Sequence, residues 1–389
     1  MVELDLSHNR IEEAGSLRQL TGLQQLFLTG NLLKEDGGFL ALPEISHLSL
    51  GHNEIHFLSS SELSPSLVSL DVTYNDLDLT KGGATKNLID AHRKRTRIRY
   101  VPQSDPLIED SYLEMAIRKH RKKPWSSLSP EDLAGMKKLD VRGQPIRSLR
   151  GLEYANNLIF LNLFETRVED LSPLAGMTKL RTLNIGGTRP VSLEPLRSCS
   201  SLQGLHMPSV RGINLEELGT LPHLEHFRLS GHEGEDLGFL SGFPNLSQLM
   251  LENVPVRDLS VLGQLPKLTK VNLNGVLAED FSVLGGLKKL KSLNLSKTSG
   301  LREVSWLGQL PQLEILSVTR TGLKDFSFLS KLPAIREIHA DKTGVVDLSP
   351  FAASRTLEVL SLVGNGITSL EGLEQCHNLR TLRGCPTGR

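Results

Sequence analysis

The 389-residue sequence predicts an α/β solenoid, in which short parallel β-strands line a concave face and 3₁₀ turns or short helices line the convex face. Three observations predict this fold. A leucine-rich pattern returns every 22 residues, segments of the type Asp-Leu-Ser-Pro-Leu recur between its copies, and aromatic residues make up only 5% of the chain. A core built mainly from one aliphatic residue at a fixed period is typical of stacked repeats, in which each repeat buries its apolar face against its neighbours.

The repeated pattern is L-x-x-L-x-L-x-x-N. It begins at residues 1, 23, 45 and 67, lapses, and then resumes at residue 136. Eleven further copies follow, at residues 158, 180, 202, 224, 246, 268, 290, 313, 335, 357 and 379. Within each run the step is constant, except that the step from Leu290 to Leu313 is longer by one, so we expect a loop to bulge near Ser299 and Gly300. In each copy the fourth and sixth residues face one side of a strand, and the third, fifth and seventh face the other.

These sixteen copies resemble the leucine-rich repeat family, and the resemblance covers nearly the whole chain. The segments 170–174, 258–262, 280–284, 325–329 and 347–351 follow the Asp-Leu-Ser-Pro-Leu pattern and resemble the 22-residue repeats of the internalin type. The segment 357–379 also resembles the repeats of phosphatase-regulating scaffolds of the SDS type. The resemblance implies a curved array whose concave sheet binds another protein.

The ninth position of the pattern turns the chain, and a polar side chain there can form hydrogen bonds between neighbouring coils. The first array has Asn9, Asn31, Asn53 and Asn75 at this position. In the second array it is filled by Thr166, Thr188, Thr298, Thr321 and Thr343, and Asn365 follows. Val210, Val254 and Val276 offer no polar side chain, so we expect looser turns there or compensation by water.

The regular rhythm breaks between residues 76 and 135. A longer coil that runs from Leu67 to Arg95, with a helix over 84–95 and a strand over 96–100, resembles the ribonuclease-inhibitor type of repeat and closes the first array. Helices over 108–120 and from Ser129 onward resemble the helical N-terminal cap of internalin-type domains. We therefore expect a first array at 1–101, a linker and helical cap at 102–135, and a second array at 136–389.

The ends and the cysteines bear on compartment. The first repeat begins at Met1 itself, so we expect the first array to be truncated or its start to be misplaced. The sequence has no secretory signal and no apolar run long enough to span a bilayer. Its three cysteines, Cys199, Cys376 and Cys385, have no metal-ligand spacing and suit a reducing compartment. We expect a cytoplasmic protein, extracellular only if the true start lies upstream, with no membrane contact.

No catalytic constellation emerges from the pattern. The phosphate-binding, nucleophile-elbow and zinc-protease motifs are missing from the sequence. Glu337, His339 and Asp341 share one strand face, but their spacing of about 6.8 Å predicts a solvated polar strip rather than a metal or acid–base site. We therefore expect neither an enzyme nor a bound metal or cofactor.

A non-enzymatic scaffold for protein–protein interaction is the function that the sequence favours. Two features of the concave face make candidate protein-binding residues. One is a pair of large apolar side chains on a single strand. The other is a group of side chains on adjacent strands whose residue types are enriched at protein interfaces. The candidates are Phe160, Phe164, His206, His226, Arg228 and Met250. For Phe160, packing on the cap helix remains an alternative to partner contact.

Two alternatives stay open. The first is a regulatory scaffold that holds a phosphatase or another enzyme, as the SDS-type resemblance implies. The second is anion or nucleic-acid contact through the basic seam 93–123, although such charges are more often solvated helix ends. The residues that would make this contact are Arg95, Arg97, Arg99, Lys122 and Lys123. The 44 basic and 44 acidic residues cancel, so no global charge draws the chain to nucleic acid, and we do not expect it as the main partner.

Overall fold

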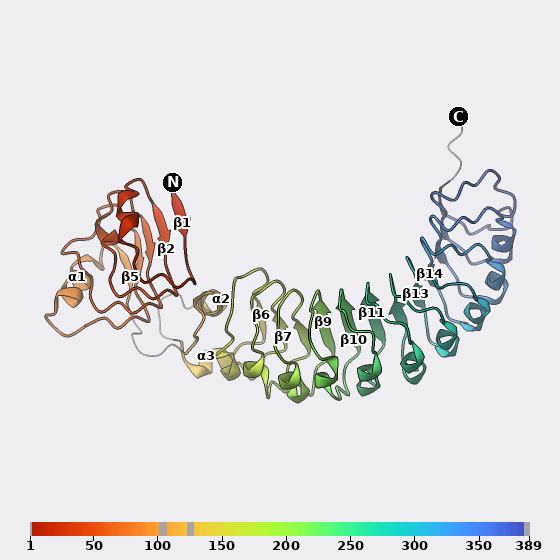
Figure 1. The fold of residues 1–389 in the computed structure, drawn as a ribbon, viewed down its shortest axis with the longest axis horizontal. Coiled ribbons are helices and arrows are strands. Elements are labelled where there is room, and N and C mark those ends of the chain that lie inside the picture. Colours follow the sequence, from red (N-terminus) through yellow and green to blue (C-terminus); the bar gives the residue numbers. More distant parts are fainter. Residues whose placement is uncertain (1, 101–106, 123–127, 385–389) are drawn as a thin grey trace. The chain divides into compact units, whose positions relative to one another are not determined.

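The computed structural model describes residues 2–100, 107–122 and 128–384. The chain forms two compact units, one made of Met1–Met136 and Ile146–Tyr154, the other of Lys137–Pro145 and Ala155–Arg389. Each unit holds one parallel sheet whose strands follow chain order (Figure 1). The predicted leucine-rich repeat solenoid is therefore confirmed. The finer division into residues 1–101, 102–135 and 136–389 stays a prediction.

The first unit contains a five-stranded sheet. Its strands are β1 (Glu3–Asp5), β2 (Gln25–Phe27), β3 (His47–Ser49), β4 (Ser69–Asp71) and β5 (Arg97–Arg99). Neighbours pair at the regular repeat period up to β4, and Ser69 pairs with Arg97 across the longer coil that the sequence predicts. Two 3₁₀ turns, η1 (Gly15–Gln19) and η2 (Phe39–Ala41), and the helix α1 (Ala84–His92) lie between strands.

Two more helices complete the first unit, α2 (Ser111–Arg121) and α3 (Pro130–Ala134), followed by η3 (Leu152–Tyr154). Helix α2 begins later than expected because the Asp110 carboxylate caps it, accepting from the backbone N–H groups of Tyr112 and Leu113. Helix α3 begins after Ser129 with a capping box formed by Ser129 and Asp132, as the sequence predicts.

The second unit contains a twelve-stranded sheet, and its strands line the inner side of the arc that this unit forms in Figure 1. The strands are β6 (Lys138–Asp140), β7 (Phe160–Asn162), β8 (Thr182–Asn184), β9 (Gly204–Pro208), β10 (His226–Ser230), β11 (Gln248–Glu252), β12 (Lys270–Asn272), β13 (Ser292–Asn294), β14 (Ile315–Ser317), β15 (Glu337–His339), β16 (Val359–Ser361) and β17 (Thr381–Arg383). Every pair is in the register that the sequence pattern predicts, and the single longer step falls between β13 and β14, where Ser292 pairs with Ile315.

The outer side of the arc carries 3₁₀ turns, which alternate with the strands. They are η4 (Ser172–Leu174), η5 (Glu194–Ser198), η6 (Leu215–Leu218), η7 (Gly238–Gly242), η8 (Ser260–Gln264), η9 (Ser282–Gly286), η10 (Ser305–Gln309), η11 (Ser327–Lys331) and η12 (Ser349–Ala353). In several coils an Asp carboxylate accepts from the N–H group two residues on, as Asp258 does from Ser260 at 2.8 Å. This local bond fixes the turn from which each 3₁₀ segment starts.

The core runs along the inside of each array. In β10 the residues alternate strictly, with Phe227 and Leu229 buried and their neighbours partly exposed. The pattern leucines stack from coil to coil, so that each coil's apolar side is covered by the next. Among the described residues, no helix is both long and apolar enough to cross a membrane.

Candidate functional site

The centre of the concave face in the second unit is formed by the longest strands of the sheet. β9, β10 and β11 each span five residues, whereas the other strands of this sheet span three. Parallel pairing places Arg228 beside His206 on one side and beside Met250 on the other. All three side chains are half-buried. The predicted neighbours of the concave face are therefore brought together by register alone.

A polar network crosses this centre. Arg228 Nη2 donates to Glu252 Oε2 at 3.1 Å, and Asn272 Nδ2 donates to Glu252 Oε1 at 2.9 Å. Glu252 thus links three strands. The Arg228 side chain is 42% exposed, so the ion pair contributes about 1 kcal/mol or less to stability. The sequence analysis missed Glu252 and Asn272, although the repeat register places them on the same face.

The two histidines of this centre have different surroundings. Burial lowers the pKa of His206, and the nearby Arg228 and His226 lower it further. His206 is therefore neutral at pH 7, with one ring nitrogen free to donate and the other to accept. His226 lies on β10, where its Nε2 is 4.0 Å from Glu225 Oε2.

Unsatisfied polar atoms are concentrated in these same coils. Seven side-chain nitrogen or oxygen atoms in the described part of the chain are covered from solvent and make no hydrogen bond. Four of them lie within the coils of β10 to β12: His226 Nδ1, Arg228 Nε, His232 Nδ1 and Asn274 Oδ1. Buried polar groups without partners are costly, and a cluster of them calls for a specific explanation.

The two phenylalanines on β7 and its turn are half-buried. Phe164 lies over Gly186 of the next coil, because a Cβ added at Gly186 would come within 2.9 Å of Phe164 Cδ2. Pro208 also lies against Gly186. Phe164 is thus partly covered by its own array. Partner contact at Phe160 and Phe164 stays a prediction.

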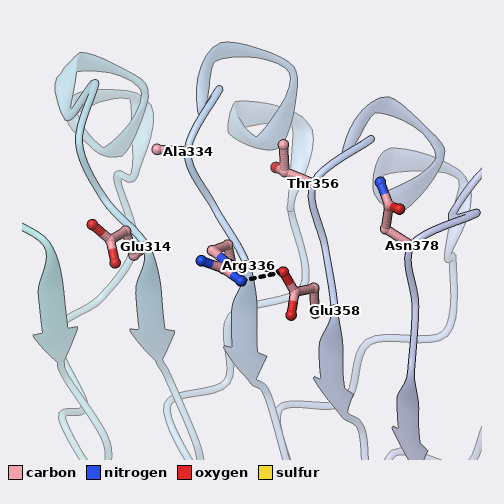
Figure 2. A pocket seen from close by; sticks show the side chains of 6 residues that line it. All are labelled: Glu314, Ala334, Arg336, Thr356, Glu358 and Asn378. Atoms are coloured by element: carbon pink, nitrogen blue, oxygen red, sulfur yellow. Dashed lines mark hydrogen bonds and ion pairs between the residues drawn. The ribbon is translucent and has the colours of Figure 1, made fainter.

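A hollow of about 500 Å³ lies at the edge of the sheet where the strands begin (Figure 2). It is lined by Glu314, Ala334, Arg336, Thr356, Glu358 and Asn378. Arg336 Nε donates to Glu358 Oε1 at 2.8 Å, and Glu314 Oε1 pairs with Lys291 Nζ at 3.0 Å. The second position of the pattern therefore carries alternating charges along this edge. This charged edge was not predicted from the sequence, although the alternation of charges follows from the repeat once its register is known.

The polar strip on β15 does not form one site. His339 Nε2 bonds to Glu337 Oε1 at 2.8 Å. Asp341 instead accepts from Ser361 Oγ at 2.7 Å and from the Val363 N–H group at 2.8 Å. In the described part of the chain, no group of three or more His, Cys, Asp or Glu side chains is arranged to hold a metal ion.

The residues of the basic seam have different surroundings. Arg99 pairs with Asp71 at 2.6 Å and lies 3.6 Å from Glu114, and Arg95 donates to the carbonyls of Leu63 and Ser64. Arg97 and Lys122 are exposed. Lys123 lies outside the described residues.

Helix α2 joins this network within the first unit. Glu114, 2% exposed, bonds to His52 Nε2 at 3.1 Å and accepts from Arg118 Nε. Burial raises the pKa of Glu114, but the contacts with His52 and Arg118 outweigh it and hold the pKa below its usual value. Burial, together with Glu114, raises the pKa of Tyr74 to about 12. These contacts tie α2 to the first array. Its role as a cap of the second stays a prediction.

The chain has the leucine-rich repeat fold and is structurally similar to internalins and to other proteins of this fold. A leucine-rich repeat protein of Leptospira interrogans matches with a TM-score of 0.58 and 17% identity, over 97% of this chain and 90% of that one. An internalin (inlF) of Listeria monocytogenes matches with a TM-score of 0.54 and 19% identity, over 71% of this chain and 95% of that one.

Internalin C2 of Listeria monocytogenes matches with a TM-score of 0.52 and 28% identity, over 55% of this chain and 95% of that one. No family model matches the chain, and no curated protein matches it in sequence. The similarities establish the fold, a long parallel sheet with 3₁₀ turns between its strands. This fold typically mediates binding and is generally non-catalytic, and it identifies no partner.

Proposed function

We propose that this protein is a non-enzymatic scaffold that binds a protein partner on the concave face of its second unit, centred on β9, β10 and β11. The residues at the centre of the proposed contact are His206, His226, Arg228 and Met250, with Glu252 and Asn272 orienting Arg228. Arginine, methionine and aromatic side chains are enriched at the centres of protein interfaces.

The observation that carries the proposal is the accumulation of unsatisfied polar atoms in the coils of β10 to β12. Arg228 Nε and His226 Nδ1 are covered and make no hydrogen bond, while the remaining atoms leave each of the two side chains 42% exposed and able to contact an approaching molecule. A partner that re-aims these side chains recovers hydrogen bonds that the free protein lacks. Since the Arg228–Glu252 pair adds little stability, its position is better explained by recognition than by folding.

The test is an affinity capture with the full chain, followed by mass spectrometry, in wild type and two variants. Arg228→Ala should remove the captured protein, because an arginine at an interface centre carries much of the binding energy. The matched control is Gln264→Ala on η8, which lies on the outer side of the arc. Capture that survives Arg228→Ala and is lost in Gln264→Ala would place the binding surface on the convex side and refute the proposal.

Two narrower forms of this proposal follow from the sequence. A partner that is itself an enzyme, such as a phosphatase, is supported only by the resemblance of residues 357–379 to SDS-type repeats. An additional anion contact through the basic seam is supported by the exposed Arg97 and Lys122, whereas Arg95 and Arg99 already bind their own chain. Retention on heparin that is absent or independent of salt would remove this second form.

A further inference from the structure

The eighth position of the repeat pattern has a left-handed backbone in each of the eleven coils from β6 to β16. Glycine adopts this conformation without strain, whereas other residues do so at a cost. From β6 to β12, glycine alternates with residues that carry a side chain: Gly143, Glu165, Gly187, Ser209, Gly231, Asn253 and Gly275.

Packing between neighbouring coils explains this alternation. A Cβ added at Gly275 would lie 2.5 Å from Asn253 Oδ1, and one added at Gly187 would lie 3.2 Å from Glu165 Cγ. At these two places the side chain at the eighth position of one coil lies over the glycine of the next, whereas Gly231, which follows Ser209, has no atom within 4 Å of an added Cβ. The glycine thus makes room where the preceding side chain is longer than serine.

The next three coils break the alternation with three successive cations. Lys297, Arg320 and Lys342 have φ values of 60°, 61° and 53°, and all three side chains are exposed. Only Lys342 is followed by a glycine, Gly364, whose added Cβ would lie 3.1 Å from Lys342 Cγ. Lys297 and Arg320 have a side chain, rather than a glycine, at the position they would otherwise cover. We call these three residues the cationic ridge.

No ion pair of the described residues includes Lys297, Arg320 or Lys342. The carboxylate of Asp341, which precedes Lys342 in the chain, is already engaged by Ser361 and the Val363 N–H group. Neighbouring coils are paired in register, with strands about 4.8 Å apart, so the three like charges repel one another. The left-handed backbone is shared with Glu165, Ser209 and Asn253, so the feature that distinguishes these three coils is the run of like charges. Like charges held side by side without an ion pair favour a ligand of opposite charge.

We propose that the cationic ridge binds an acidic segment of a protein partner. The proposal rests on the proposed function in one respect, that the partner is a protein. The three charges lie at intervals of about 4.8 Å and span about 10 Å, which places them within reach of two successive carboxylates on one face of an extended peptide, about 6.8 Å apart.

A single-stranded nucleic acid is the less suitable occupant. Such ligands are held by aromatic rings on which bases stack, in addition to positive charge. In the described coils around the ridge, Trp306, Phe326 and Phe328 are all buried, and no ring of Phe, Tyr or Trp is exposed. The ridge therefore offers charge without a stacking surface.

The test is binding of a fluorescein-labelled polyglutamate peptide to the full chain, followed by anisotropy at low salt. The triple variant K297G/R320G/K342G should weaken binding by about tenfold or more, because it removes three charges. The melting temperature should stay equal or rise, since glycine relieves the left-handed strain. The control N253G changes the same backbone position without charge and should bind as wild type. The variant K297Q/R320Q/K342Q keeps the side-chain length and should lose binding as the glycine variant does.

Equal binding by wild type and the triple variants would overturn the proposal. Tighter binding of oligothymidylate or heparin of matched charge through the same residues would overturn the peptide assignment. Arg228→Ala should leave polyglutamate binding unchanged. If the chain binds polyglutamate through the ridge while the concave centre captures no partner, the ridge assignment stands and the function proposed for the centre fails.

Discussion

The two arrays close their turns with different chemistry, although they share one repeat. In the first unit, Asn53 Nδ2 donates to Leu28 O and Leu50 O at 3.0 Å each, and its Oδ1 accepts from the Leu33 N–H group at 3.1 Å. Asn31 and Asn75 repeat this arrangement. Each asparagine therefore links its own coil to the preceding one through buried hydrogen bonds.

In the threonine coils of the second unit the side chain at this position bonds within its own coil, whereas Asn365 links two coils, donating to Ala340 O and accepting from the Thr343 N–H group. Thr298 Oγ1 donates to Leu295 O at 2.8 Å, within its own coil, and the other threonines follow suit, with Thr343 also bonding to Asn365. Val210 and Val254 are fully buried and contribute apolar contact only. The strands just before them, β9 and β11, are extended to five residues. Val276 is fully buried too but follows β12, which spans three residues, so apolar packing rather than strand length is what the three valine turns share.

The two units also differ in how deeply their carboxylate ion pairs are buried. In the first unit Glu114 is enclosed by His52, Arg118 and Arg99, with 3% of its side chain exposed. In the second unit Glu358 pairs with Arg336 at a solvent-facing edge, where the arginine side chain is 58% exposed. The same type of ion pair should therefore matter very differently in the two units.

The largest effect is expected for Glu114→Ala. It leaves Arg118, 4% exposed, without the carboxylate that its Nε contacts, and breaking such a buried pair costs about 3–5 kcal/mol. The matched control, Glu358→Ala, should cost about 1 kcal/mol or less. Urea denaturation of the full chain, with limited proteolysis to assign each transition to a unit, measures both. Comparable losses in the two variants would contradict the contrast.

Asn53→Ala should have the next largest effect, about 3 kcal/mol, because it removes the bonds to two carbonyls and leaves the buried Leu33 N–H group without an acceptor. Thr298→Ala removes one local bond and should cost about 1 kcal/mol. The same denaturation experiment compares them, and a threonine variant as damaging as the asparagine variant would mean that the ladder is not what distinguishes the arrays.

Acidification should destabilise the first unit in part through Glu114. The pKa of Glu114 lies below its ordinary value of 4.5 in the folded chain, so its contribution is fully present above pH 4.5 and is lost as the pH falls through the lower folded value. Thermal melts across this range, with proteolysis to assign the transitions, should show the loss in wild type. Glu114→Gln should flatten this part of the profile, and an unchanged acid response in that variant would remove Glu114 as its cause.

The smallest effect concerns backbone opening at the turns. Amides following Val210, Val254 and Val276 should exchange with deuterium about tenfold faster than those following Asn53 and Asn75, because no side chain bridges their coils. Mass spectrometry of peptic peptides resolves these turns. Uniformly slow exchange would indicate that apolar packing alone holds them closed.

Most of the fold is predictable because each copy of the repeat specifies its own strand and turn through residues that are close together in the sequence. Alternation fixes which residues of each strand face the core, and the period fixes the register, so the one longer step is found where the sequence places it, between β13 and β14. The contacts of α2 were not predictable, since the segment lies outside the repeat and no periodicity states where Glu114 docks. In the sequence, the left-handed backbone at the eighth position shows only as glycines in some copies of the repeat. The pattern does not state how these glycines pack against the neighbouring coil.

The candidate site likewise has a part that the sequence predicts and a part that only the structure shows. The adjacency of His206, Arg228 and Met250 follows from register and was predicted. The pairing of Arg228 with Glu252 depends on side-chain rotamers, which a sequence pattern does not specify. The unsatisfied atoms at His226 and Arg228 are likewise a property of packing and emerge only from the structure.

The most direct test of the concave-face account is the hydrogen-exchange footprint of the full chain with its captured protein partner. We predict slower exchange in β9, β10 and β11 on binding, with the 3₁₀ turns η6 to η8 unchanged. Protection confined to those turns, with the three strands unaffected, would contradict it.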